Sequence, residues 1–237
     1  MQRVPEPELM DGGEQVLAYA NADFDASDQA MVERLAWRCG GDPGPRLLDL
    51  GCGPGNISFR LARRWPQAQV LGLDGAPRML AVARERLAAQ PELQGRLQFA
   101  EALLPLPAGS GLSTGFSAVV SNSLLHHLHD PAVLWRATAA LAAPGAFVYV
   151  QDLRRPASPA AVEAMVAEQM QGAPEVLRCD YHASLHAAFT PEEVALHLQQ
   201  AGLADQLQVQ ALEDRYLEVW GVLGGASPAA LPVRLAR

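Results

Sequence analysis

Apolar and polar residues follow one another along this chain in blocks of helical or strand periodicity. Two leading blocks, residues 8–20 and 28–39, place apolar side chains three and four positions apart, which predicts two helices. A break rich in glycine and proline follows at residues 40–45. Short apolar runs then alternate with amphipathic stretches as far as residue 151. This alternation is typical of a doubly wound, mainly parallel sheet in an α/β fold.

The first five strands and their helices can be placed from the same pattern. We expect strands over residues 46–50, 69–73, 96–100, 116–121 and 146–151, and helices over 57–64, 76–89 and 131–142. Pro131 suits the first turn of its helix, where a missing N–H costs nothing.

The pattern changes after Asp152. The segment that follows contains prolines, one predicted helix over residues 159–170 and a polar cluster at 179–182, and we interpret it as an insertion that covers the sheet edge. Thr190 and Glu193 have the spacing of a capping box and predict a helix that ends near Gly202.

The end of the chain predicts a hairpin and a tail. Residues 207–212 and 216–223 are apolar runs a few residues apart, as expected for an antiparallel pair of strands. Residues 224–237 are rich in alanine, proline and glycine and predict a loose tail.

Composition restricts the class of protein. The chain has 237 residues, 49% hydrophobic and 19% charged, so it can bury the core of one large domain. Its net charge of −8 disfavours a general nucleic-acid binder, because such a surface repels phosphates. Three scattered cysteines without a CxxC motif predict neither a disulfide framework nor a zinc site.

Nothing in the sequence predicts export or membrane insertion. Residues 1–10 lack the apolar run of a signal peptide, and the apolar stretch 132–150 is interrupted by Arg136, Pro144 and Gly145. We therefore expect a soluble, cytoplasmic protein.

The stretch LLDLGCGPG, residues 47–55, carries the most chemical information. An apolar strand runs into a glycine loop that opens a helix, so that a ligand can approach the backbone closely. Asp74 follows at the end of the next strand, where a carboxylate can hold the two hydroxyls of a ribose.

Two kinds of nucleotide ligand use this arrangement. The dinucleotide fingerprint GxGxxG requires a third glycine where this chain has Asn56. Asp49, two residues before the first glycine, would repel a pyrophosphate but tolerates an amino acid that carries an ammonium and a sulfonium. The charges thus favour S-adenosylmethionine over NAD.

Residues 46–153 resemble the cofactor half of class I S-adenosylmethionine-dependent methyltransferases, particularly the small-molecule type. The resemblance is carried by DLGCGPG with its spaced Asp74 and continues through FSAVVSNSLLHHLHDP to GAFVYVQDL. It implies a Rossmann-like sheet of seven strands within a single domain. We assign residues 1–45 to an N-terminal helical cap, 46–152 to the cofactor-binding half, 153–189 to a lid insertion, 190–223 to a C-terminal helix and hairpin, and 224–237 to the tail.

The same resemblance implies a set of cofactor-binding residues. Asp49 and the backbone of Gly51, Cys52 and Gly53 would hold the methionine part, and Asp74 the ribose. The remaining residues would line the adenine, cover the cofactor or face it after the fourth strand: Gly75, Met79, Glu101 (where the family usually has Asp), Ala102, Tyr19, Ser121 and Asn122. Tyr19 fits a core tyrosine equally well.

The histidine-rich stretch 126–129 suggests a metal site, but we expect none. A short loop rarely brings three such histidines onto one ion, and no carboxylate or cysteine cluster supports it. The family's recurring histidine falls on His127, where packing or a hydrogen bond is the simple role. Proton abstraction by His126 or His127 is the alternative.

The sequence does not identify the methyl acceptor. Tyr181, His182 and His186 in the lid are the candidate acceptor-side polar groups, although a solvated loop explains them equally well. We expect transfer of the methyl group from S-adenosylmethionine to a small molecule by in-line displacement. The alternatives are a methyltransferase of RNA or protein, a catalytically silent cofactor-binding protein and a nicotinamide oxidoreductase. Ser121-Asn122-Ser123-Leu124 lacks the [DNS]PP[FYW] loop of nucleic-acid amine methyltransferases.

Overall fold

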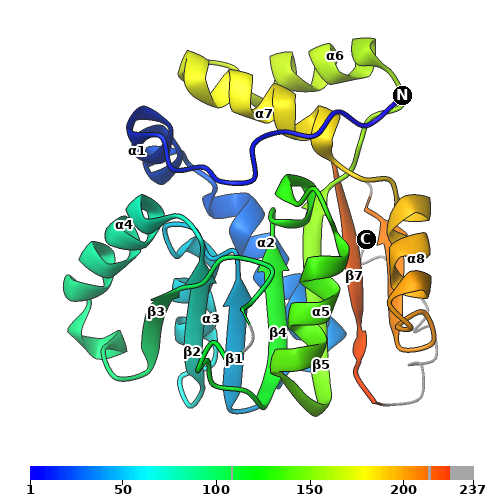
Figure 1. Ribbon diagram of the computed structural model, residues 1–237. Coiled ribbons are helices and arrows are strands. Elements are labelled where there is room, and N and C mark those ends of the chain that lie inside the picture. The colour runs from blue at the N-terminus through cyan, green and yellow to red at the C-terminus, as the bar shows by residue number, and fades with distance from the viewer. Residues whose placement is uncertain (108, 213–214, 225–237) are drawn as a thin grey trace, which may run out of the picture.

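Seven strands form one sheet in the order β3-β2-β1-β4-β5-β7-β6 (Figure 1). The computed structural model describes residues 1–107, 109–212 and 215–224. The strands are β1 (Arg46–Leu50), β2 (Gln69–Asp74), β3 (Leu97–Glu101), β4 (Phe116–Asn122), β5 (Ala142–Leu153), β6 (Leu207–Ala211) and β7 (Tyr216–Val222). β1 to β5 are parallel, and β7 runs antiparallel to both of its neighbours. This confirms the predicted doubly wound sheet with a C-terminal hairpin.

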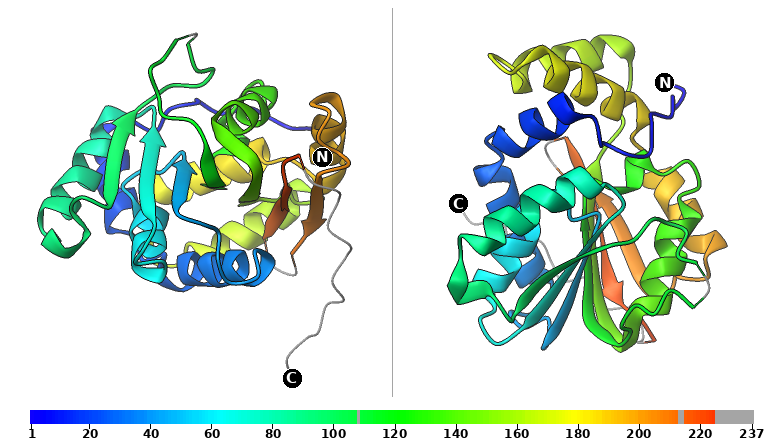
Figure 2. Two further views of the ribbon diagram at one scale, coloured as in Figure 1. Left: turned by 90° about the horizontal axis from the view of Figure 1, so that it is seen from below. Right: turned by 60° about the vertical axis from the view of Figure 1, so that its left-hand side comes forward.

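Helices cover both faces of the sheet because strand side chains alternate in direction (Figure 2). Leu47 of β1 packs with α2 and α3, whereas Leu48 packs with α5 and α8 on the opposite face. The helices are α1 (Gly13–Asn21), α2 (Asp25–Arg38), α3 (Asn56–Arg64), α4 (Pro77–Ala88), α5 (Ala132–Leu141), α6 (Pro159–Gln169), α7 (Glu175–Ala187) and α8 (Pro191–Gln200), with short 3₁₀ turns η1 (Pro91–Leu93) and η2 (Leu125–His127).

The capping box at α8 is present as predicted. The Glu193 N–H donates to Thr190 Oγ1 at 3.3 Å, and the Thr190 N–H donates to Glu193 Oε2 at 2.9 Å. Apart from Gly224, the predicted tail lies outside the described residues.

Two segments differ from the sequence-based expectation. The lid contains a second helix, α7, which includes the polar cluster at 179–182. Its buried apolar residues Leu177 and Leu185 are eight positions apart, and the polar residues between them hide the helical period. At the other end of the chain, the first helix begins at Gly13 rather than at residue 8, because the preceding residues cross the surface in extended form.

These first twelve residues, here called the N-terminal strap, run over the carboxyl edge of the sheet beside α7 (Figure 1). Arg3 fastens the strap: its guanidinium donates to the carbonyls of Ala187, His126 and Leu128 at 2.6, 2.9 and 3.0 Å. The strap, α1, α6 and α7 thus form a layer above the strand ends. None of the helices in the described part of the chain is long and apolar enough to span a membrane.

Candidate functional site

The glycine loop connects β1 to α3 in a tight turn. Gly51 and Gly53 have φ angles of 72° and 52°, in the left-handed region that glycine adopts without strain. The N–H groups of Gly51 and Cys52 both donate to the Leu73 carbonyl, at 2.8 and 3.0 Å. These N–H groups are therefore already paired, as is the Cys52 carbonyl, which accepts from the Gly55 N–H at 2.9 Å. The space beside Gly53, where a side chain would lie, is open to a ligand.

Asp74 fixes the loop from the neighbouring strand. Its Oδ2 accepts from the Gly53 N–H at 2.7 Å, and its Oδ1 accepts from the Ala76 N–H at 2.8 Å. One carboxylate thus holds the turn after β1 and the start of α4 in a single arrangement.

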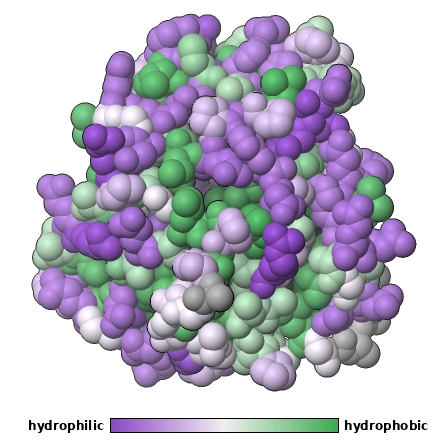
Figure 3. All heavy atoms as spheres, in the orientation of Figure 1, coloured by the Kyte–Doolittle hydropathy of each residue, from purple (hydrophilic) through white to green (hydrophobic). Residues whose placement is uncertain are grey.

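A cavity opens above this loop, at the point where the strand order reverses between β1 and β4. We call it the glycine-loop cavity. Ten of the residues expected at the cofactor line it: Tyr19, Asp49, Gly51, Cys52, Gly53, Asp74, Gly75, Met79, Ala102 and Asn122. Figure 3 shows apolar side chains gathered around a hollow near the centre of this face.

Two expected residues lie outside the lining. Glu101 is exposed at the end of β3, so the cavity wall there is formed by the following residues, Ala102 and Leu103. Ser121 is fully buried, and its hydroxyl donates to the Leu50 carbonyl at 2.8 Å. Side chains alternate along a strand, so Ser121 points away while Asn122 faces the cavity.

Carboxylates dominate the charge of the glycine-loop cavity. Glu8, Asp28, Asp49 and Asp74 line it, whereas no lysine or arginine does among the residues described. Asp49 Oδ1 is buried without a hydrogen-bond partner, and Asp28 Oδ2 is buried with an ion pair to Arg60 at 3.6 Å. Burial raises the pKa of Asp49 to about 7 and that of Asp28 to about 6. This wall suits a cationic ligand and would repel a pyrophosphate.

A second cavity, the lid cavity, adjoins the first beneath α7. Six residues line both cavities and form their common wall: Met10, Tyr19, Asp28, Asn122, Ser123 and His127. Ser123 has a φ of 56°, a conformation that non-glycine residues rarely adopt and that is often found at functional sites.

The predicted acceptor-side residues divide between the lid cavity and the outer surface. His126, His127 and Tyr181 line the lid cavity. His182 instead contacts Glu163 of α6 at 3.0 Å, and His186 packs against the His182 ring; neither residue lines the cavity. Because α7 is a helix, its side chains point in different directions, and only Tyr181 of these three lies at the cavity.

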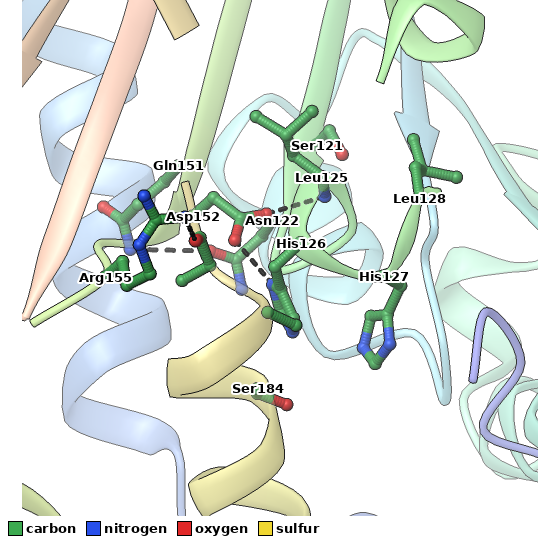
Figure 4. Close-up of polar contacts among 12 residues, drawn as sticks. Ser121, Asn122, Leu125, His126, His127, Leu128, Gln151, Asp152, Arg155 and Ser184 are labelled. Carbon is green, nitrogen blue, oxygen red and sulfur yellow. Dashed lines mark hydrogen bonds and ion pairs between the residues drawn. The ribbon is translucent and has the colours of Figure 1, made fainter. Parts of the chain in front are cut away.

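Two buried acids flank the histidine pair on η2. His126 Nδ1 lies 2.5 Å from Asp152 Oδ1, while Asp152 Oδ2 accepts from the Leu125 N–H at 2.7 Å (Figure 4). Glu6 Oε1, from the N-terminal strap, lies 3.5 Å from His126 Nε2 and 3.3 Å from His127 Nδ1.

Burial and these acids move the pKa values of the group in different directions. Burial lowers the pKa of His126, but Asp152 and Glu6 outweigh it and leave the value raised. Burial and the neighbouring His126 place the pKa of His127 well below its ordinary range, and burial raises the pKa of Glu6.

The sequence analysis did not identify Glu6 or Asp152. Asp152 stands at the end of β5, where the parallel topology directs a side chain toward the same edge as Asn122, so its position was a usable signal. Glu6 lies in a strap without periodicity, and nothing local indicates its contacts.

Comparison with known proteins gives a consistent result. Residues 48–148 match the family model of a methyltransferase domain. The ubiquinone biosynthesis O-methyltransferase of Xanthomonas campestris pv. campestris is 34% identical over 181 residues, which are 75% of this chain and 69% of the relative.

Solved structures share the fold at lower identity. The plantazolicin methyltransferase BpumL, in complex with a desmethyl analogue and SAH, has a TM-score of 0.68 at 11% identity and covers 90% of this chain and 92% of its own. An O-methyltransferase family protein from Burkholderia thailandensis has a TM-score of 0.58 at 23% identity, covering 91% of this chain and 64% of its own.

Proposed function

The chain belongs to the class I S-adenosylmethionine-dependent methyltransferases, and we propose that the atom it methylates is the oxygen of a hydroxyl group. Its cofactor is S-adenosylmethionine and its acceptor a small molecule. The choice of oxygen is supported by the curated relatives, which are O-methyltransferases. A flat, weakly polar acceptor fits the aromatic and apolar side chains of the lid cavity: Phe24, Leu153, Met170, Leu177, Tyr181 and Tyr216.

We further propose where the cofactor lies. The observation that carries this placement is the row of carboxylates without a lysine or arginine among the described residues that line the glycine-loop cavity. The unpartnered Asp49 Oδ1 would accept from the methionine ammonium, and Asp74 would hold the ribose hydroxyls. Met79 and Ala102 would then lie against the adenine.

This placement assigns the methyl group to the common wall of the two cavities. There the acceptor oxygen would form its bond to the methyl carbon while the C–S bond breaks opposite to it, and the hydroxyl proton would leave to water or to a neighbouring base. Because the sulfonium is already a good leaving group, the protein contributes mainly alignment and the exclusion of water. Tyr19, Asn122 and Ser123 form the wall through which the transfer would occur.

A product assay tests the proposal. The full chain is incubated with S-adenosylmethionine and matched acceptors that present a phenol, an alcohol, an amine, a thiol or a carboxylate on similar apolar frames. Release of S-adenosylhomocysteine and the methylated product are measured. We expect turnover with the phenol or the alcohol, whereas turnover confined to the amine, the thiol or the carboxylate would refute a hydroxyl acceptor.

A further inference from the structure

The Glu6, His126 and His127 cluster has the composition of a metal site. Its three ligand atoms lie within 4.8 Å of one another, and the side chains are only 8%, 3% and 10% exposed. Two imidazoles and one carboxylate form a donor set typical of zinc and of related divalent transition metals.

Both distances from the Glu6 carboxylate to the histidine nitrogens agree with a tetrahedral ion, and the two histidine nitrogens lie within 4.8 Å of each other. Metal–ligand bonds of about 2.0–2.2 Å place neighbouring ligand atoms of a tetrahedron about 3.3–3.5 Å apart. Glu6 Oε1 lies 3.5 Å from His126 Nε2 and 3.3 Å from His127 Nδ1. These separations are longer than good hydrogen bonds, and both Glu6 Oε1 and His127 Nδ1 are buried without a hydrogen-bond partner.

Further residues orient the ligands as they do around known metal ions. Asp152 contacts the Nδ1 of His126 at 2.5 Å and directs its Nε2 toward Glu6. The Ser184 hydroxyl donates to Glu6 Oε2 at 3.2 Å, leaving Oε1 for the cluster. A carboxylate behind a ligating histidine and a hydrogen bond to a ligating carboxylate are the usual supports of such ligands.

We propose that Glu6, His126 and His127 bind one divalent transition-metal ion of the zinc type, with its fourth coordination position toward the lid cavity. Both histidines line that cavity, which places an open position on the acceptor side. Three protein ligands and one exchangeable position are the pattern of a catalytic rather than a structural zinc site.

Resting on the proposed function, the fourth position takes the acceptor's hydroxyl oxygen. A hydroxide held at that position first takes the hydroxyl proton and leaves as water, and the acceptor oxygen replaces it on the metal as the more nucleophilic anion. That oxygen then forms a bond to the methyl carbon while the C–S bond breaks. The electron pair of the C–S bond stays on the sulfur, which gives S-adenosylhomocysteine.

The histidine stretch 126–129 predicts no metal site by itself, because a short loop rarely brings three histidines onto one ion and the sequence shows no carboxylate or cysteine cluster to support one. In the structure the carboxylate comes from the strap, 120 positions earlier. His129, the third histidine of the stretch, is 57% exposed in its side chain and contacts Glu8 and the Glu6 carbonyl, outside the three-residue cluster.

Metal binding is measured first, on the full chain after treatment with a chelator. Zn²⁺ is titrated against a chromophoric chelator, and Co²⁺ is followed by the intensity of its visible absorption, which is strong for tetrahedral sites. We expect one equivalent of each metal. Loss of a ligand in Glu6→Gln or His127→Ala should reduce the Zn²⁺ affinity by more than about 100-fold, and Asp152→Asn by about 10- to 100-fold. The matched neighbour variant His129→Ala should bind as the parent does.

Binding of S-adenosylhomocysteine to the metal-free variants reports that they are folded. Absence of stoichiometric Zn²⁺ binding by the folded parent, or unchanged binding in both ligand variants, would overturn the metal site. If the metal-free chain methylated hydroxyl groups at the full rate, the metal would have no role in the reaction, but the proposed methylation of a hydroxyl oxygen would still hold. A bound metal with methylation of amines alone would refute the oxygen acceptor and leave the site intact.

Discussion

Asp74 acts at the scale of a single residue, because its two oxygens hold the two turns that form the glycine-loop cavity. We expect Asp74→Ala to weaken binding of S-adenosylhomocysteine by about 1.5–3 kcal/mol, the cost of losing hydrogen bonds to a charged group. Calorimetric titration measures the change. Glu101→Ala is the matched control, since Glu101 pairs in register with Asp74 at the end of the adjacent strand but does not line the cavity. Equal affinity in the two variants would contradict this role for Asp74.

Asp49 predicts a pH dependence with opposite signs for binding and stability. Burial raises its pKa to about 7 in the free protein, so the carboxylate that attracts the cofactor's ammonium is lost as the pH falls below 7. Affinity for S-adenosylhomocysteine should therefore fall between pH 7.5 and 6. In Asp49→Asn the affinity should be weaker and the slope near pH 7 should disappear.

Folding stability of the free protein should change the other way. A pKa above the unfolded value means that the contribution of Asp49 to stability is lost as the pH rises through 7. Free Asp49→Asn should thus be more stable than the parent at pH 8 by at least about 1 kcal/mol, as measured by denaturant unfolding. A variant that is less stable at pH 8 and equally stable at pH 5 would show that the unpaired charge is not the controlling feature.

Residues joined to a recognisable local pattern could be predicted from the sequence, and those joined only by long-range contacts could not. Asp49 and Asp74 flank a glycine loop whose order along the chain fixes their place at the strand ends. Ser121 and Asn122 were both expected to face the cofactor, but neighbouring side chains of a strand point to opposite sides, and only Asn122 lines the cavity. The contact between Glu6 and His127 depends on the strap lying beside η2, which no local pattern in the sequence indicates.

At the scale of elements, α7 forms one wall of the lid cavity through Tyr181 and Leu177. Tyr181→Ala should lower kcat/KM for the acceptor at least about tenfold and leave the affinity for S-adenosylhomocysteine nearly unchanged, because the side chain aligns the acceptor. His182→Ala is a matched control on the same helix, since that side chain pairs with Glu163 outside the cavity. Equal effects of both substitutions on kcat/KM would remove α7 from the acceptor site.

The N-terminal strap is the second element on which the site depends. Arg3 joins it to the end of α7 and to η2 through three carbonyls and lies over the Phe189 ring, 4.0 Å from its centre. We expect Arg3→Ala to cost about 1.5–3 kcal/mol of stability and to expose the strap to limited proteolysis. Arg136→Ala removes an exposed pair with Asp130 and should cost less than about 1 kcal/mol. A strap as resistant in Arg3→Ala as in the parent would show that other contacts hold it.

The strands of the cofactor-binding half could be predicted because they are short apolar runs bounded by turn signals, and helices follow all of them except β3, from which a loop leads directly to β4. The lid was harder to predict for a physical reason: α6 and α7 bury only narrow stripes, with Val162, Val166 and Leu185 packing against Leu153 and each other. Polar side chains occupy the rest of both helices, so their apolar period is weak in the sequence. Strands buried on both faces give continuous apolar runs, which are easier to recognise in a sequence than the narrow apolar stripe of a helix that covers a site from one side.

At the scale of the whole molecule, cofactor binding should be visible as a gain in stability. A ligand that binds only the folded chain at about 100 times its dissociation constant stabilises the chain by about 2.7 kcal/mol. For a domain of this size, that corresponds to a rise in Tm of about 5–10 °C. We expect such a rise with S-adenosylmethionine or S-adenosylhomocysteine, because the ligand joins the glycine loop, α4 and the layer of α1 above them, all of which line one cavity.

NADH provides the decisive contrast, since it contains a ribose and an adenine but carries a pyrophosphate. Four carboxylates line the glycine-loop cavity, and no lysine or arginine is among its described lining residues, so NADH should leave Tm unchanged at the same concentration. Asp74→Ala should show a reduced rise with S-adenosylhomocysteine, which ties the effect to this cavity. A rise with NADH comparable to that with S-adenosylhomocysteine would mean that adenosine contacts, rather than the charge of the cavity, determine which nucleotide this fold holds.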